Sequence, residues 1–262
     1  MKRFVLALGL SIFLSGISFA QSSRLDRVFL AGELRVCIWP DYYGISYRNP
    51  KTLQLSGIAI DLAQALAKDL GVRLRFEDSS FAKLIEDVTA DHCDIAMFAI
   101  GITPERSQKL RFTRPHLISD VHAITMRSNR RIGTWADIDQ PGVVVAVAKG
   151  TYHEQLMRQK LKSASLLVTA TPQGREQEVI SGRADVFMTD YPFSRRMLEM
   201  TDWARLVTPP ETFHLTPYAF AVQPGDDTWH SRVESFVAEI KRDGRLLAAA
   251  QRNKLDAIVA RD

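Results

Sequence analysis

The segment Cys93–Arg106 begins as an apolar run of strand length, turns polar and ends on an arginine. This pattern predicts a buried strand that delivers a loop at its carboxyl end, where ligands bind in open α/β sheets. Gly101 leaves backbone N–H groups accessible and the guanidinium of Arg106 presents a planar fork of donors, so the loop suits a carboxylate. The alternative for Arg106 is an ordinary solvated surface residue.

Two further loops carry side chains that suit a charged ligand. Thr151 follows Gly150 directly before a helical pattern, where free N–H groups and the helix dipole favour an anion, and a plain helix N-cap is a compatible alternative. Asp190 follows an apolar run and precedes Pro192, so it is either a second helix cap or the partner of a ligand ammonium group. With Arg106 it would pair both charges of a zwitterion, which are costly to leave unpaired in a closed cleft.

Recognisable catalytic and cofactor motifs are absent from the sequence. The six histidines show no metal-ligand spacing, and there is no G-x-S-x-G, Walker A or G-x-G-x-x-G pattern. We therefore expect a protein that is not an enzyme and that needs no cofactor or metal ion. An acid/base pair that only the fold brings together stays open.

Strand and helix patterns alternate along the chain in two sets of the same order. The first set has strands at 34–38, 72–76 and from 93 onward, with helices at 58–70 and 81–89; the second has strands at 143–147, 166–169 and 184–188 with helices between them. A β-α-β-α-β order implies a parallel sheet that is covered on both faces. We predict an α/β protein with two lobes.

The lobes are assigned from the polar break Ser128–Arg131 and the late apolar strand Tyr218–Val222. Lobe 1 is predicted to contain residues 21–127 and 222–262, and lobe 2 residues 128–221. The apolar runs Val121–Met126 and Tyr218–Val222 are predicted to be the two crossing strands, and such a pair would form a natural hinge.

Residues 1–20 have the features of a secretory signal peptide: Lys2 and Arg3, an apolar run to Leu14, and the small-x-small site Ser18–Ala20. The alternative, a membrane anchor, is disfavoured because a span needs about 20 apolar residues. We expect export to a bacterial periplasm. Without Lys2 and Arg3 the net charge falls from +4 to +2, which is too small to indicate nucleic-acid binding.

The only two cysteines, Cys37 and Cys93, each lie in or beside an apolar strand pattern. In an oxidising compartment a disulfide between them is plausible if the strands are neighbours, since adjacent strands lie about 4.8 Å apart. Two buried thiols are the alternative.

The loop after the first strand is rich in aromatic residues, among them Trp39 and Tyr42. Aromatic side chains in an irregular segment commonly cover the edge of a core. At the carboxyl end of a strand they are also suited to form the walls of a pocket.

Five motifs, in one order along the chain, resemble the periplasmic solute-binding proteins of polar amino-acid ABC importers. They are GELRV at 32–36, SGIAIDLA at 56–63, CDIAM with ITPER at 93–106, KGT at 149–151 and GRADVFMTD at 182–190. The resemblance covers nearly all of the chain after the leader. It implies the type II fold of two α/β lobes that close on a ligand, a monomer, an amino acid or small carboxylate as ligand, and an ABC permease in the inner membrane as partner.

The resemblance also implies roles for individual residues. Arg106 would bind the α-carboxylate of the ligand with help from the backbone at Gly101 and Thr151, and Asp190 would bind its α-amine.

Tyr42 and Phe81 match the aromatic wall positions of the family. Two departures concern the ligand: Gly101 stands where many relatives have a hydroxyl residue, and Trp39 stands where several have an acid. A ligand with a cationic side chain is therefore less expected.

The chain is also similar to cyclohexadienyl dehydratase, a catalytic branch of this fold, in its Val-Cys opening, its CDIAM run and its Pro141-Gly142 pair. The resemblance implies a glutamate general acid three residues after the second-lobe aspartate, and this position is Phe193 here. A benzyl group cannot donate the proton for dehydration, so the enzyme is the alternative function. It would be revealed by turnover of prephenate or arogenate. A ligand-sensing subunit of a membrane receptor is a third possibility, since it would use the same fold.

Overall fold

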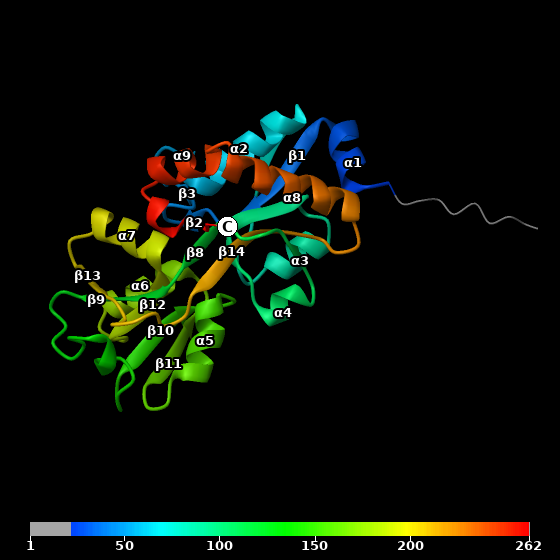
Figure 1. Cartoon of the computed structure of the whole chain (residues 1–262). Coiled ribbons are helices and arrows are strands. Elements are labelled where there is room, and N and C mark those ends of the chain that lie inside the picture. Colours follow the sequence, from blue (N-terminus) through cyan, green and yellow to red (C-terminus); the bar gives the residue numbers. More distant parts are fainter. Residues whose placement is uncertain (1–21, 262) are drawn as a thin grey trace, which may run out of the picture.

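The computed structural model describes residues 22–261, so the predicted leader lies outside the described residues. The chain forms two α/β lobes, each around its own sheet, which are joined side by side (Figure 1). The predicted two-lobed architecture is confirmed.

The sheet of lobe 1 has the strand order β5-β1-β6-β14-β7, with β8 paired to β14. β1 is parallel to both β5 and β6, whereas β14 is antiparallel to β6. The chain moves from β1 outward to β5 and then back across to β6. Right-handed crossovers therefore place α2 and α3 on opposite faces of this sheet. The strands are β1 (Glu33–Ile38), β5 (Arg73–Asp78), β6 (Ile95–Gly101), β7 (Arg111–Phe112), β8 (Leu117–Ser119) and β14 (Thr216–Val222). The helices are α1 (Arg24–Ala31), α2 (Ile58–Leu70), α3 (Leu84–Thr89), α4 (Pro104–Ser107), α8 (Asp227–Arg242), α9 (Arg245–Arg252) and the short η2 (Asp256–Ile258).

Lobe 2 repeats this plan with the order β11-β10-β12-β9-β13. β10 is parallel to β11 and β12, and β9 is antiparallel to β12 and β13. The strands are β9 (Val121–Met126), β10 (Val144–Ala148), β11 (Ser165–Thr169), β12 (Val186–Asp190) and β13 (Ala204–Val207). The helices are η1 (Trp135–Asp137), α5 (Tyr152–Lys160), α6 (Pro172–Ile180) and α7 (Tyr191–Met200).

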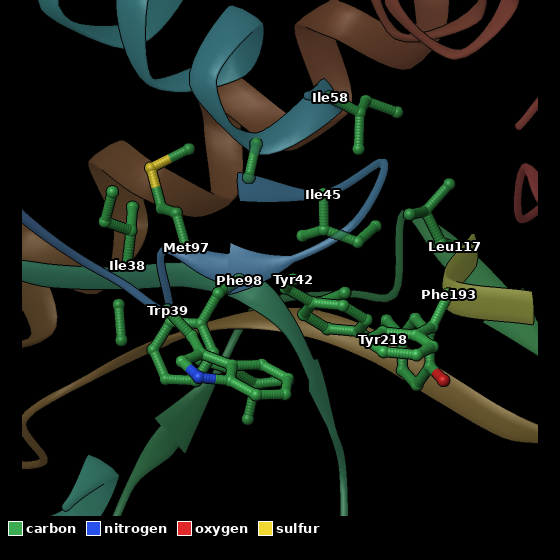
Figure 2. Packing of buried hydrophobic residues seen from close by; sticks show 14 of the residues in the cluster. Ile38, Trp39, Tyr42, Ile45, Ile58, Met97, Phe98, Leu117, Phe193 and Tyr218 are labelled. Carbon is green, nitrogen blue, oxygen red and sulfur yellow. The ribbon is translucent and has the colours of Figure 1, made fainter. Parts of the chain in front are cut away.

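A small third sheet follows β1 and positions the aromatic loop. It is formed by β2 (Asp41–Tyr42), β3 (Ser46–Arg48) and β4 (Leu55–Ser56). Trp39 and Tyr42 are 5% and 4% exposed, so both rings are buried at the carboxyl end of β1. Figure 2 shows them with Phe98 of β6 in one buried cluster that also includes Phe193 of α7, so the apolar core continues from lobe 1 into lobe 2.

The chain crosses between the lobes at points that differ from the predicted boundaries. β8 pairs with β14 in the first sheet and β9 with β12 in the second, so the first crossing lies at Asp120 and not near residue 127. The return crossing lies at 208–215, between β13 and β14. The polar break Ser128–Arg131 is a turn at the far end of β9. An apolar strand pattern does not specify the partner strand. The predictions that β9 belongs to lobe 1, that residues 216–221 of β14 belong to lobe 2 and that both strands are crossings are therefore wrong.

The side chain of Asp120 ties the two crossing segments together. Its carboxylate accepts hydrogen bonds from Val121 N at 2.8 Å, His214 N at 2.7 Å and Phe213 N at 3.0 Å. One carboxylate thus fixes the first crossing to the end of the second, beside the boundary between the lobes.

Cys37 of β1 and Cys93, two residues before β6, are joined by a disulfide with a Cα–Cα distance of 5.6 Å. The parallel pairing of β1 with β6 sets Cys37 opposite Ala96, which brings the two cysteines within bridging distance. The bridge therefore links the two strands that deliver the Trp39–Tyr42 loop and the Gly101–Arg106 loop.

Replacing both cysteines with alanine is expected to lower the free energy of unfolding by about 4 kcal/mol, because the bridge spans 56 residues and restricts the unfolded chain. Urea unfolding followed by circular dichroism measures the change. Wild-type protein in dithiothreitol is the matched control and should lose a similar amount. A double variant as stable as the oxidised wild type would contradict this account of the bridge.

Candidate functional site

Asp190 ends β12 and begins α7, and its carboxylate is buried at the boundary between the lobes. Its Oδ1 accepts a hydrogen bond from Phe193 N at 3.1 Å, so the residue caps α7 as one of the two interpretations predicted. Its Oδ2 accepts hydrogen bonds from the hydroxyls of Tyr42 and Tyr218, the latter at 2.7 Å. Both tyrosines belong to lobe 1, so this single carboxylate connects the lobes.

The two tyrosines act as neutral donors. Burial, with a further contribution from the charge of Asp190, raises the pKa of Tyr42 and of Tyr218 well above 10. Neither phenol ionises at neutral pH, and each presents its O–H to the carboxylate.

Arg106 lies in α4, where Thr103 caps the helix and Pro104 begins it. The side chain is only 5% exposed, so the interpretation as a solvated surface residue is wrong. Its guanidinium donates hydrogen bonds to Gly101 O at 2.8 Å and to Gly150 O of lobe 2 at 3.0 Å. Within residues 22–261 it forms no ion pair with a carboxylate. Burial lowers its pKa to about 10, which leaves it cationic at neutral pH.

Gly101 is packed too tightly for a side chain. A Cβ atom there would lie 2.8 Å from Cγ2 of Thr216 and 3.5 Å from Cδ1 of Tyr152. The side chains of Thr216 and Tyr152 therefore fill the space that a side chain at position 101 would need.

Thr151 precedes α5 and is 5% exposed. Its Oγ1 donates to Ala148 O at 2.7 Å, and the side chain does not cap the helix. The N–H of Gly150, which was predicted to be free for an anion, instead donates to Oε2 of Glu154 at 2.8 Å. In this arrangement Thr151 contributes a wall of the site, and the Gly150 N–H is already occupied.

Aromatic rings from lobe 1 form the opposite wall. The ring centroids of Trp39 lie 5.0 Å from Tyr42 and 5.1 Å from Phe81, and those of Tyr42 and Phe81 are 5.9 Å apart. These rings and lobe 2 enclose a cavity of about 10 Å³, roughly the smallest volume that holds one water molecule. The lobes are therefore closed. The cavity is lined by Trp39, Tyr42, Phe81, Ala99, Thr151, Tyr152, His153, Arg175, Thr189 and Asp190.

Five of the seven predicted ligand-binding residues line this cavity, but Arg106 and Gly101 do not. Arg106 lines a neighbouring hollow of about 330 Å³, which also includes Gly150 of lobe 2. Phe81 borders both spaces, and its ring centroid lies 5.2 Å from Cζ of Arg106. A ligand that reaches both Arg106 and Asp190 must therefore displace part of the aromatic wall or enter while the lobes are apart.

Five residues of the cavity wall were not among the predicted ligand-binding residues: Ala99, Tyr152, His153, Arg175 and Thr189. Tyr152 and His153 directly follow Thr151 in α5, so their proximity was available from the chain itself. Arg175 stands four residues before the buried Val179 in α6, and this spacing places both on one helix face. That spacing was the only signal that Arg175 points inward.

The model of the family described as bacterial extracellular solute-binding proteins, family 3, matches residues 34–255 of the chain. The chain belongs to this family. As a family 3 solute-binding protein it shares the type II two-lobed fold of the amino-acid-binding proteins among its structural neighbours.

Three known proteins illustrate what this family member is similar to. It is 33% identical to cyclohexadienyl dehydratase of Pseudomonas aeruginosa over 94% of this chain and 91% of that protein. It is 26% identical to the L-cystine-binding protein TcyJ of Escherichia coli over 95% and 92% of the two chains. The crystal structure of AncCDT-1, an ancestral amino acid-binding protein and precursor of cyclohexadienyl dehydratase, superposes with a TM-score of 0.80 at 31% identity, covering 88% of this chain and 99% of that one.

Two further observations on this solute-binding protein concern membrane spans and metal sites. None of the helices in residues 22–261 combines the length and the apolar character that a membrane span requires. In the same part of the chain, no three His, Cys, Asp or Glu side chains are grouped so that they could hold a metal ion.

Proposed function

We propose that this protein captures a free amino acid or a related small carboxylate in the bacterial periplasm and delivers it to an ABC permease of the inner membrane. The observation that carries this proposal is the buried guanidinium of Arg106, which bonds to one carbonyl of each lobe and has no carboxylate partner among the described residues. A buried guanidinium is best satisfied by a bidentate carboxylate. Membership of the solute-binding family and the L-cystine-binding relative support the same function.

Ligand entry requires the lobes to separate, because the closed cavity is far smaller than any amino acid. In the bound form the α-carboxylate takes the place of Gly150 O on Arg106, assisted by the backbone at Gly101 and Thr151. The ammonium group takes the place of the Tyr42 hydroxyl on Asp190. Trp39, Tyr42 and Phe81 then exclude water from the paired charges, which strengthens the pairing.

A thermal-shift screen against the amino acids, their deaminated acids and prephenate tests this function. A ligand at 1,000 times its Kd stabilises the folded protein by about 4 kcal/mol, which is readily seen in the melting temperature. Shifts with amino acids support the Arg106–Asp190 pairing. Shifts restricted to acids without an amine would remove Asp190 as an ammonium partner, and the absence of any shift would contradict the proposal.

Arg106→Ala is expected to weaken ligand binding more than tenfold, about 1.4 kcal/mol, because it removes the carboxylate partner. Titration calorimetry with the strongest ligand of the screen measures the change. Arg130→Ala, at an exposed arginine of lobe 2, is the matched control and should leave the affinity unchanged. Equal affinities for the Arg106 variant and the control would refute the role of Arg106.

Gly150 permits a close approach between the backbones of the two lobes. A Cβ atom on this residue would lie 2.6 Å from both Cα and N of Ala82, which are backbone atoms of lobe 1 that cannot yield as a flexible side chain would. The φ angle of Gly150 is +77°, and Gly182 has a similar φ of +75° with open space around it. A comparison of alanine substitutions at these two glycines therefore separates the effect of backbone strain from the effect of blocked closure.

Gly150→Ala is expected to weaken ligand binding at least tenfold, because the added methyl group holds the lobes apart. Gly182→Ala introduces comparable backbone strain without the clash and should bind within about twofold of the wild type. Small-angle X-ray scattering should show that ligand reduces the radius of gyration of the control more than that of Gly150→Ala. Equal compaction and equal affinity of the two variants would show that this contact does not govern closure.

A second candidate function is a dehydratase that acts on a cyclohexadienyl substrate, since the relative of that name is 33% identical over 94% of the chain. The position expected for the general acid is Phe193, which is 1% exposed and packs with its ring 4.3 Å from Cζ of Arg175. This side chain has no proton to donate. Incubation with prephenate, followed by detection of the aromatic product, distinguishes the two functions.

A further inference from the structure

Arg175 is a second buried cation in the cavity wall, and its bonding is incomplete. It is 2% exposed and extends from α6 between two rings, with Cζ 4.3 Å from the centroid of Phe193 and 4.9 Å from that of Phe187. Its Nη1 donates to Met188 O at 2.8 Å, whereas its Nε has no hydrogen-bond partner in the described chain. The rings fix the position of the guanidinium, and its Nε–H donor remains unused.

No carboxylate within residues 22–261 forms an ion pair with Arg175. Burial raises the pKa of the adjacent Glu176, while the charge of Arg175 opposes this shift. The oxygens of Asp190 are already engaged by the N-terminus of α7 and by two tyrosines. A buried cation without a paired anion is costly, so the positive charge favours an anion from outside the chain.

The second unpartnered group beside Arg175 is Nε2 of His153, which also lines the cavity. Burial, and next the charge of Arg175, lower the pKa of His153 well below its usual value. His153 is therefore neutral and adds no second positive charge.

The buried charges define the ligand that completes the site. Around the cavity and the neighbouring hollow, lobe 1 contributes one buried cation, Arg106, and lobe 2 contributes one buried cation, Arg175, and one buried anion, Asp190. A neutral zwitterion would satisfy Arg106 and Asp190 and leave Arg175 unpaired. A ligand with two acidic groups and one ammonium group matches all three charges.

We propose that Arg175 binds the acidic side chain of the ligand, so that this protein selects amino acids of the aspartate and glutamate type. This inference rests on the proposed function, because it assigns a ligand class to the same cavity. It also accounts for the expected rejection of cationic side chains, since such a group would face Arg175 across a dry cavity.

Titration calorimetry with glutamate, glutamine, aspartate and asparagine tests the inference on the wild-type protein. Each acid and its amide are nearly equal in shape and differ in charge, so the comparison isolates the second acidic group. We expect one of the acids to bind at least tenfold more tightly than its amide, and arginine to show no binding.

Arg175→Met retains an unbranched side chain that can lie between the two rings and removes the charge. It is expected to weaken binding of the preferred acid at least tenfold and that of its amide less than threefold, whereas Arg175→Lys should recover part of the loss. Arg183→Met replaces an exposed arginine of the same lobe that is paired with Glu178, and should bind both ligands as the wild type does.

The outcomes separate this inference from the proposed function. Binding of a neutral amino acid as tight as that of the preferred acid would overturn the role of Arg175 and leave amino-acid capture intact. Failure of every amino acid to bind would overturn both. If Arg175→Met does not fold, as judged by circular dichroism, the wild-type comparison of acid with amide still decides the question.

Discussion

The arrangement of the two lobes depends on one buried carboxylate. Asp190 is 1% exposed, and its charge is stabilised by the N-terminus of α7 and by the hydroxyls of Tyr42 and Tyr218 from the other lobe. A buried ion needs such partners, because burial without them costs several kcal/mol. In the proposed open form the Tyr42 bond is replaced by water or by a ligand, and an ammonium group is the replacement with the strongest attraction for this anion.

Lobe 1 supplies Arg106, whose positive charge is opposite to that of Asp190, and a disulfide braces the strands that carry it. Tyr42 follows β1 and Arg106 follows β6, and these adjacent parallel strands are joined by the Cys37–Cys93 disulfide. In the proposed opening of the lobes, the two loops would therefore keep their relative position. Lobe 2 would move against them about the segments that Asp120 connects, so distances between the lobes would change more than distances within each lobe.

The sequence was sufficient for the fold class because the periodicity of apolar residues distinguishes strands from helices in both lobes. It was not sufficient for the lobe boundaries, since the apolar patterns of β9 and β14 fit either sheet and only pairing decides between them. It predicted that Asp190 lies at the end of a strand and the start of a helix, because an apolar run followed by Pro192 is a local signal. It missed Arg175 because a single arginine in a polar helix gives no local indication that its side chain lies between Phe187 and Phe193.

The most direct test of the account is a crystal structure of the protein grown with the amino acid that stabilises it most. The account predicts closed lobes with the α-carboxylate within about 3 Å of the Arg106 guanidinium and the ammonium group within about 3 Å of Asp190 Oδ2, while the Tyr42 hydroxyl has moved away from that oxygen. A ligand bound elsewhere, or held in this cavity while Arg106 and Asp190 keep their present partners, would contradict it.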